Sequence, residues 1–149
     1  MSTYPEDDPV AATLDAVGDR WTLLIVRDLL RGVVRYADLQ RSLAPIAPNL
    51  LAGRLRRLEE LGCVTREVYS QRPLRAQYAL TPKGRALAPI IVTIGRFAID
   101  HLGHDEPDYL AAHVGCGGRV PPTAWRCLRC GEDVRAGALE LRSPAAMAR

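Results

Sequence analysis

Four side chains near the carboxy terminus have the types and the spacing of metal ligands. His113, Cys116, Cys127 and Cys130 follow the pattern H-x2-C-x10-C-x2-C. Two close-spaced pairs, each on a turn, supply the four ligands of tetrahedral zinc in knuckles and ribbons. Glycines follow Cys116 and Cys130 and let backbone N–H groups turn toward thiolate sulfur. The pattern predicts a structural zinc ion, Zn2+, because protein ligands fill all four positions and leave none for water.

Other interpretations of these cysteines stay open at the level of sequence. Cys127 and Cys130 alternatively form a redox pair or a disulfide, although a cytoplasmic chain rarely keeps a structural disulfide and no βαβ pattern surrounds C-L-R-C. A metal or redox sensor and unliganded thiols are further alternatives, and His104 or water can replace His113 as a ligand. Cys63 lies in an apolar context and is expected to behave as a small core residue.

A second set of side chains, rich in arginine, lies between Pro48 and Thr81. This segment holds six arginines against three glutamates, a net charge of +3 that equals the net charge of the whole chain. Charge gathered on one element is the footprint of a nucleic-acid surface. Arginine reads guanine edges and asparagine reads adenine, whereas some arginines bind phosphate only. The expected DNA contacts are Asn49, Arg54, Arg56, Arg57, Gln71, Arg72 and Arg75. The alternative for each arginine is a solvated charge, paired with Glu59 or Glu60.

Length and composition limit the class of protein. At 149 residues, with 48% hydrophobic and 25% charged residues, the chain is expected to form one domain with a small appendage. No apolar run approaches the length of a membrane span, and the acidic amino terminus lacks the apolar region of a signal peptide. The expected location is therefore the cytoplasm. No nucleophile elbow, phosphate loop, H-E-x-x-H motif or carboxylate pair is present, so an enzyme is not expected.

The arginine-rich segment belongs to a predicted winged helix-turn-helix over residues 36–80. The expected elements are a helix over 36–43, a turn over 44–47, a helix over 48–61, a strand over 64–69, a tip over 70–75 and a strand over 77–80. Such a unit places its second helix in the DNA major groove and a basic wing beside it. Ile46 is expected to fill the angle between the two helices, and Pro48 to open the second. The predicted buried stripe of that second helix is Leu51, Leu55, Leu58 and Leu61, which leaves Asn49, Gly53, Arg56 and Glu60 on its exposed face. There Gly53 either weakens the helix or allows close approach to DNA.

Two longer helices flank this unit in the predicted structure. The first covers about Val10 to Arg31. The second begins with Thr81 as its cap and Pro82 at its first position, and it runs to about Leu102 with a kink at Pro89. Their apolar faces exceed what a small winged domain can bury, which favours a homodimer whose recognition helices bridge half-sites about 34 Å apart. The alternative is that both helices cover the core of their own chain.

The chain resembles the HxlR-type transcriptional regulators, relatives of the MarR group, over roughly residues 9–102. The matching runs are D-A-V-G-D-R-W-T-L-L-I-V-R-D-L-L-R-G, R-Y-A-D-L-Q-R-S-L, P-N-L-L-A-G-R-L-R-R-L-E-E-L-G and Y-A-L-T-P-K-G-R-A-L. The resemblance implies a homodimer that binds pseudo-palindromic operators and represses or activates nearby bacterial genes. Several members carry a redox-sensing cysteine directly before the Pro-Val that opens the first helix. This chain has Asp8 there, so that thiol switch is not carried over.

We therefore expect a mainly α-helical protein with a small β-hairpin wing and a zinc-ribbon-like appendage. The expected division is a disordered segment 1–8, a winged DNA-binding and dimerisation domain 9–103, a zinc-binding segment 104–140 and a flexible tail 141–149. The expected function is sequence-specific binding of double-stranded DNA by a dimeric regulator. The alternative function is a protein-interaction adaptor that reuses the winged fold. An unknown small-molecule effector stays open, because no polar cluster marks its site.

Overall fold

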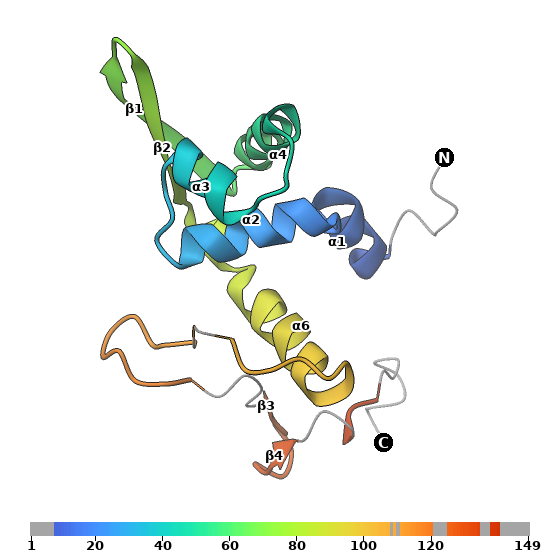
Figure 1. Ribbon diagram of the computed structural model, residues 1–149. Helices are drawn as coiled ribbons and strands as arrows, with labels where there is room; N and C mark the ends of the chain where they lie inside the picture. Colours follow the sequence, from blue (N-terminus) through green and yellow to red (C-terminus); the bar gives the residue numbers. More distant parts are fainter. Residues whose placement is uncertain (1–7, 108, 110, 121–124, 135–137, 141–149) are drawn as a thin grey trace. The chain divides into compact units, whose positions relative to one another are not determined.

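The structure, a computed structural model, describes residues 8–107, 109, 111–120, 125–134 and 138–140 (Figure 1). Most of the predicted disordered segment and the predicted flexible tail lie outside these residues. The chain divides into two compact units, Met1–Ile91 and Val92–Arg149. None of the helices in the described ranges is long and apolar enough to cross a membrane.

The amino-terminal helical region consists of two helices, α1 (Pro9–Val17) and α2 (Arg20–Leu30) (Figure 1). The prediction of one helix over 10–31 is wrong, because Gly18 and Asp19 interrupt it. Asp19 has extended backbone, and its carboxylate accepts hydrogen bonds from two backbone N–H groups of α2 at 3.0 and 3.1 Å. Such a cap stabilises a helix start by about 1 kcal/mol, so the chain begins a new helix at this point.

The helix-turn-helix forms as predicted, from α3 (Tyr36–Ser42) and α4 (Pro48–Glu60). Ile46, in the turn between them, is buried and fills the angle between the two helices. The cap residue Ala47 provides no side-chain hydrogen bond, and proline opens α4. The Tyr36 hydroxyl instead links the two helix starts by donating to the carbonyl of Pro48 at 2.8 Å.

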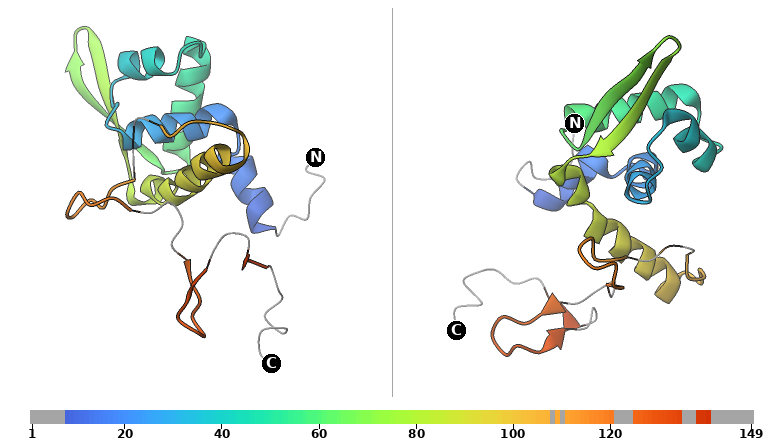
Figure 2. Two further views of the ribbon diagram at one scale, coloured as in Figure 1. Left: turned by 60° about the horizontal axis from the view of Figure 1, so that its bottom comes forward. Right: turned by 90° about the vertical axis from the view of Figure 1, so that its left-hand side faces the viewer.

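The wing is an antiparallel hairpin of β1 (Val64–Gln71) and β2 (Leu74–Leu80). Both views in Figure 2 show it projecting from the helices of the first unit. Its strands are longer than predicted, because residues expected in the tip continue the ladder. The tip is thereby reduced to Arg72 and Pro73, where the missing proline N–H needs no partner.

The helix predicted after the wing is also divided, into α5 (Pro82–Arg85) and α6 (Ala88–His101). Thr81 caps α5 as predicted, since its hydroxyl accepts a hydrogen bond from a backbone N–H of that helix at 3.2 Å. The predicted kink at Pro89 is wrong. The chain breaks before Pro89, which occupies the first turn of α6, where a proline needs no hydrogen-bond partner.

The residues after α6 form two short antiparallel pairs. β3 (Trp125–Arg126) pairs with β4 (Asp133–Val134), and an isolated bridge joins Ala112 to Arg119. Beyond Gly84, none of the described residues is buried. These pairs therefore have no apolar core of their own among the described residues.

The core of the first unit lies where α2, α4 and the wing meet. One face of α4 contributes Leu51, Leu55 and Leu58, all at most 1% exposed, as the predicted leucine stripe requires. They pack with Ile25 and Val26 of α2 in one cluster. The other buried members of this cluster are Leu29, Leu39, Leu43, Ile46, Cys63, Val64, Tyr78 and Leu80. Burial of each large aliphatic side chain contributes about 1.5–3 kcal/mol, so this cluster sets the orientation of α4.

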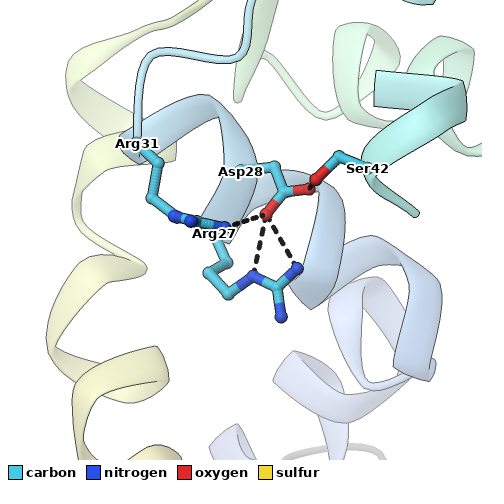
Figure 3. Close-up of polar contacts among 4 residues, drawn as sticks. All are labelled: Arg27, Asp28, Arg31 and Ser42. Carbon is cyan, nitrogen blue, oxygen red and sulfur yellow. Dashed lines mark hydrogen bonds and ion pairs between the residues drawn. The ribbon is translucent and has the colours of Figure 1, made fainter. Parts of the chain in front are cut away.

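A buried carboxylate connects α2 to α3 (Figure 3). Asp28 is fully buried, and its Oδ2 accepts a hydrogen bond from the Ser42 hydroxyl at 2.7 Å. Its Oδ1 faces the guanidinium groups of Arg27, at 2.8 Å, and Arg31, at 3.6 Å. A buried charge is tolerated only when it is paired and hydrogen-bonded. The arrangement thus holds the first helix of the helix-turn-helix against α2.

Replacement of Asp28 by asparagine should destabilise the first unit by about 1–3 kcal/mol, because the two arginines lose their counter-charge and a buried hydrogen-bond network is broken. Urea unfolding followed by circular dichroism measures the difference. The control is Asp38→Asn, on α3, whose partner Arg41 is exposed and 3.3 Å away. A surface pair contributes about 0–1 kcal/mol. Equal losses in the two variants would contradict a structural role for the buried carboxylate.

Candidate nucleic-acid interface

Burial of the leucine stripe leaves the opposite face of α4 exposed. Asn49, Gly53, Arg56 and Glu60 all lie on this exposed face, as predicted. The Oδ1 atom of Asn49 accepts a hydrogen bond from the N–H of Leu50 at 3.0 Å, which holds the amide at the start of the helix. The helix therefore presents a polar amide at its amino end and a guanidinium group two turns further on.

The three arginines of α4 have different surroundings. Arg54 lies at the edge of the buried face, and its Nε is 3.3 Å from Asp19 Oδ1, an ion pair rather than an aligned hydrogen bond. Arg57 is 3.7 Å from Glu60 and half-exposed. Arg56 is exposed and has no ion pair among the described residues. Arg56 is thus the most available cation of α4, whereas Arg54 also connects α4 to α2.

Hydrogen bonds join the base of the wing to the end of α4. The Thr81 hydroxyl donates to the carbonyl of Gly62, and Lys83 Nζ donates to the carbonyl of Leu61, both at 2.7 Å. Gly84 packs so closely that a Cβ atom there would lie 2.0 Å from the Cys63 carbonyl oxygen. These contacts fix the wing relative to the exposed face of α4.

The outer end of the wing carries the remaining predicted DNA contacts. Gln71, Arg72 and Arg75 are all exposed. They lie at the opposite end of the hairpin from its anchored base, and β1 also contacts α4. The structure therefore distributes the predicted contacts over two adjoining elements of the first unit. Their individual roles toward DNA stay predictions.

A groove that sequence reasoning missed lies between α3 and the wing. The segment before α3 pairs with β2, since the Tyr78 N–H donates to the Val34 carbonyl at 2.8 Å and Arg35 bridges to Gln77. This pairing creates a hollow of about 610 Å³, which we call the α3–wing groove. Three arginines and three tyrosines dominate its lining: Arg35, Arg66, Arg75, Tyr36, Tyr69 and Tyr78.

The α3–wing groove is cationic. In the described part of the chain, none of its three arginines has a carboxylate within ion-pairing distance. The guanidinium of Arg35 lies 5.8 Å from the centre of the Tyr69 ring, an arrangement that leaves its N–H groups available. Asp38, which also lines the groove, is paired with Arg41. Burial, and then the neighbouring Tyr78, raise the pKa of the Tyr36 hydroxyl, which therefore stays a neutral donor.

Arg66 is one of the six arginines of the basic segment, but its position in a predicted strand does not indicate which residues it lies beside. Arg35 lies outside that segment. Only the pairing of residues 34–35 with β2 brings Arg35 beside Arg66. The local charge pattern could have identified Arg66, whereas Arg35 required the tertiary structure.

The predicted zinc ligands are exposed or half-exposed, and the structure brings them together only in pairs. His113 Nδ1 lies 3.2 Å from Cys116 Sγ. Hydrogen bonds from the backbone of Cys130 and then Arg129, followed by the Cys130 side chain, lower the pKa of the Cys127 thiol. Among the described residues, no three histidine, cysteine or acidic side chains converge on one point. The single four-ligand cluster expected from the sequence is thus not assembled here, and a zinc ribbon is not supported by the fold.

The two other positions considered for redox chemistry, Asp8 and Cys63, have roles in the fold. Asp8, in place of the sensing cysteine, caps α1, accepting hydrogen bonds from the N–H groups of Val10 and Ala11 at 2.8 and 2.9 Å. Cys63 is 4% exposed within the core. An enclosed apolar environment leaves a thiol inert, which agrees with the expectation that Cys63 is a core residue.

A helix-turn-helix followed by a basic hairpin defines the winged helix class of DNA-binding proteins. Comparison with known families identifies the chain further. It belongs to the HxlR-like helix-turn-helix family, whose model matches residues 16–106, more than half of its length. The protein is accordingly a DNA-binding transcriptional regulator, and its relatives are regulators rather than enzymes.

Relatives in sequence support this assignment. An uncharacterized HTH-type transcriptional regulator of Mycobacterium tuberculosis is 39% identical over 132 residues, covering 88% of this chain and 82% of that protein. The HTH-type regulator YvaP of Bacillus subtilis is 37% identical over 97 residues, covering 65% of this chain and 87% of the relative. The first similarity therefore extends past the winged unit.

Solved structures agree with the sequence relatives. The crystal structure of PA1607, described as a candidate transcription factor, has a TM-score of 0.73 at 36% identity and covers 92% of this chain and 95% of its own. The redox regulator HypR in its reduced form has a TM-score of 0.60 at 34% identity, and the match covers 64% of this chain and 94% of the HypR chain. The winged helix fold predicted from sequence is confirmed.

Replacement of Gly53 by alanine should raise the free energy of unfolding by about 1 kcal/mol, because alanine is the better helix former and its Cβ atom meets nothing within 4 Å. Urea unfolding measures this gain. DNA affinity then separates the two interpretations of Gly53: a several-fold loss indicates close approach to DNA, and unchanged affinity indicates a merely weakened helix. Gly95→Ala on α6 is the control, since its Cβ atom also meets nothing within 4 Å. A loss of stability in Gly53→Ala would contradict the prediction.

Proposed function

We propose that the protein binds a pseudo-palindromic operator as a homodimer, with α4 in the major groove and the wing on flanking DNA. The observation that carries the proposal is the exposed basic surface of α4 and the wing. Arg56, Arg72 and Arg75 are exposed there without an ion pair among the described residues. Guanidinium groups without internal partners are free to contact base edges and phosphates.

Exposed apolar side chains support the homodimer. Val10 and Leu14 of α1, Ile94 and Phe97 of α6, and Leu102 directly after it are each more than half exposed. Large exposed apolar groups gathered on helices mark interfaces with other chains. Two copies joined through these helices would present two α4 helices to successive turns of one face of DNA. We propose repression as the outcome, because a dimer across an operator occupies DNA that a polymerase needs.

The α3–wing groove extends the proposed DNA surface. Its three arginines have no counter-charge among the described residues, and guanidinium groups bind phosphate oxygens. Several cations without counter-charges in one hollow attract a polyanion, so we assign the groove to a DNA backbone rather than to an effector. We therefore assign Arg35 and Arg66 to phosphate contacts. An effector, if one exists, needs another site, and the cytoplasmic location inferred from the sequence stays part of this proposal.

Two further features complete the proposal. We infer that the segment after α6 is a zinc-ribbon-like appendage that takes no part in reading base pairs. The adaptor function considered from the sequence is not favoured, because an interaction surface for proteins has no need of Arg56, Arg72 and Arg75 exposed on α4 and the wing without a counter-charge among the described residues.

Selection from random duplex DNA at about 150 mM salt should enrich a pseudo-palindrome with half-sites about ten base pairs apart. The spacing follows from a two-fold axis that places two recognition helices one DNA turn apart. Sequencing of the selected pool gives the motif, and light scattering of the complex gives its stoichiometry. A single enriched half-site, bound by one chain, would contradict the homodimer. No enrichment by folded protein would favour the adaptor.

Two double variants should separate base reading from phosphate binding. Arg56→Ala with Arg57→Ala should weaken binding and relax the preferred motif, because it removes groups on the exposed face of α4. Arg35→Ala with Arg66→Ala should leave the motif unchanged and reduce the salt slope by about two per chain, one for each lost phosphate contact. Binding isotherms at several salt concentrations measure both effects.

The control for these variants is Arg85→Ala, on α5 at the base of the wing. It removes the same charge but lies away from the proposed surface, at the end of the hairpin opposite its tip. An equal loss of affinity per arginine removed, in the control and in both double variants, would mean that net charge alone drives binding. An unchanged salt slope in the Arg35, Arg66 variant would remove the α3–wing groove from the interface.

A further inference from the structure

The carboxy-terminal segment contains a turn, residues 112–119, that presents two of the predicted ligands. The Gly117 N–H donates to the carbonyl of His113 at 2.7 Å, and the His113 N–H donates to the carbonyl of Gly118 at 2.9 Å. Gly117 has a φ of +70°, which glycine adopts without strain. Residues Ala112 and Arg119 form a β-bridge below the turn. We call this turn the first knuckle.

A second turn, residues 126–133, has the same construction. The Gly131 N–H donates to the carbonyl of Cys127, and the Cys127 N–H donates to the carbonyl of Glu132, both at 2.9 Å. Gly131 has a φ of +75°. The strands below this second knuckle pair Arg126 with Asp133.

The two knuckles match atom by atom in their backbone hydrogen bonds. Each feature of the first knuckle recurs fourteen residues later, so that Cys127 corresponds to His113 and Cys130 corresponds to Cys116. Both knuckles place their potential ligands at the second and fifth positions of the turn, and a glycine with positive φ directly follows the fifth. Their equivalence does not follow from the cysteine spacing, because a redox pair or an isolated thiol in one turn needs no counterpart in the other.

The first knuckle holds its ligand atoms near the separation that a metal requires. His113 Nδ1 and Cys116 Sγ are 3.2 Å apart, and tetrahedral zinc with ordinary bond lengths separates a nitrogen and a sulfur ligand by about 3.6 Å. Glycines leave room around both groups. A Cβ atom at Gly115 would lie 3.0 Å from the His113 ring, and one at Gly118 would lie 3.3 Å from Cys116 Sγ.

Burial of apolar side chains does not explain why these two turns have a defined conformation. Val114, in the first knuckle, and Leu128, in the second, are almost fully exposed, and Trp125 is 42% exposed. Small segments without a core depend on disulfides or metals for stability, and the four cysteines of the chain are free thiols in this structure. A metal would supply the folding free energy that burial does not.

We propose that one zinc ion joins the two knuckles through His113, Cys116, Cys127 and Cys130. Binding releases three thiol protons, because the cysteines ligate as thiolates. All four ligands come from the protein, so the ion has no position open for catalysis. Among the described residues no three of these side chains converge on one point, and the proposal places both pairs on one ion. The inference concerns the proposed appendage and is independent of DNA binding.

Metal analysis of the untagged full chain, expressed with ample zinc, tests the proposal. We expect about one zinc ion per chain. Cys116→Ser, in the first knuckle, and Cys130→Ser, in the second, should each lose it, because one ligand set spans both turns. Cys63→Ser is the matched control and should keep its zinc. Zinc retained after Cys116→Ser but lost after Cys130→Ser would overturn the shared site, as would a wild-type chain that neither contains nor takes up zinc.

Two spectroscopic readouts identify the ligands and the extent of ordering. Cobalt in place of zinc should show the visible bands of a tetrahedral site with thiolate-to-metal charge transfer, and His113→Ala should change them. Amide hydrogen exchange should show that a strong chelator removes protection from residues 113–131 while the winged unit keeps its own. Unchanged exchange in the knuckles after zinc removal would contradict a folding role for the ion. Operator binding, measured separately, does not bear on either result.

Discussion

The proposed DNA surface depends on the burial of one leucine stripe of α4 against α2. Leu51, Leu55 and Leu58 are inaccessible to solvent or nearly so, and they meet Ile25 and Val26 in a single cluster. Because an α-helix turns about 100° per residue, this burial fixes which residues of α4 face outward. The base of the wing is then joined to the end of the same helix by hydrogen bonds, so both basic elements take their orientation from one apolar contact.

Ion pairs divide the arginines of the first unit into two kinds. Arg27 and Arg31 lie beside the carboxylate of Asp28 at the end of α2, and Arg54 lies beside Asp19, which connects α4 with the start of α2. The arginines of the wing and of the α3–wing groove have no carboxylate partner among the described residues. A guanidinium that is already neutralised gains less from a phosphate than one without an internal partner, so the same residue type serves packing in one place and the proposed recognition of DNA in another.

Several expectations from the sequence depend only on local periodicity or capping, and these hold. The leucine stripe, the proline start of α4, the plug formed by Ile46 and the threonine cap of α5 are of this kind. The predictions of two long uninterrupted helices are wrong for a shared reason, because the helical spacing of apolar residues continues across each break. Asp19, in an extended conformation, separates α1 from α2, and the chain breaks again before Pro89. Periodicity alone gave no sign of these breaks, although a capping aspartate and a proline stand at them.

The residue pattern by itself determined the winged fold, the exposed face of α4 and the closeness of His113 to Cys116, because these depend on contacts within a few residues. The α3–wing groove was decided by tertiary structure, since Arg35 reaches Arg66 only when residues 34–35 pair with β2. The pairing of Arg54 with Asp19 likewise joins residues far apart in the chain. Long-range contacts of this kind follow from how the apolar faces pack together, which no local spacing of residue types records.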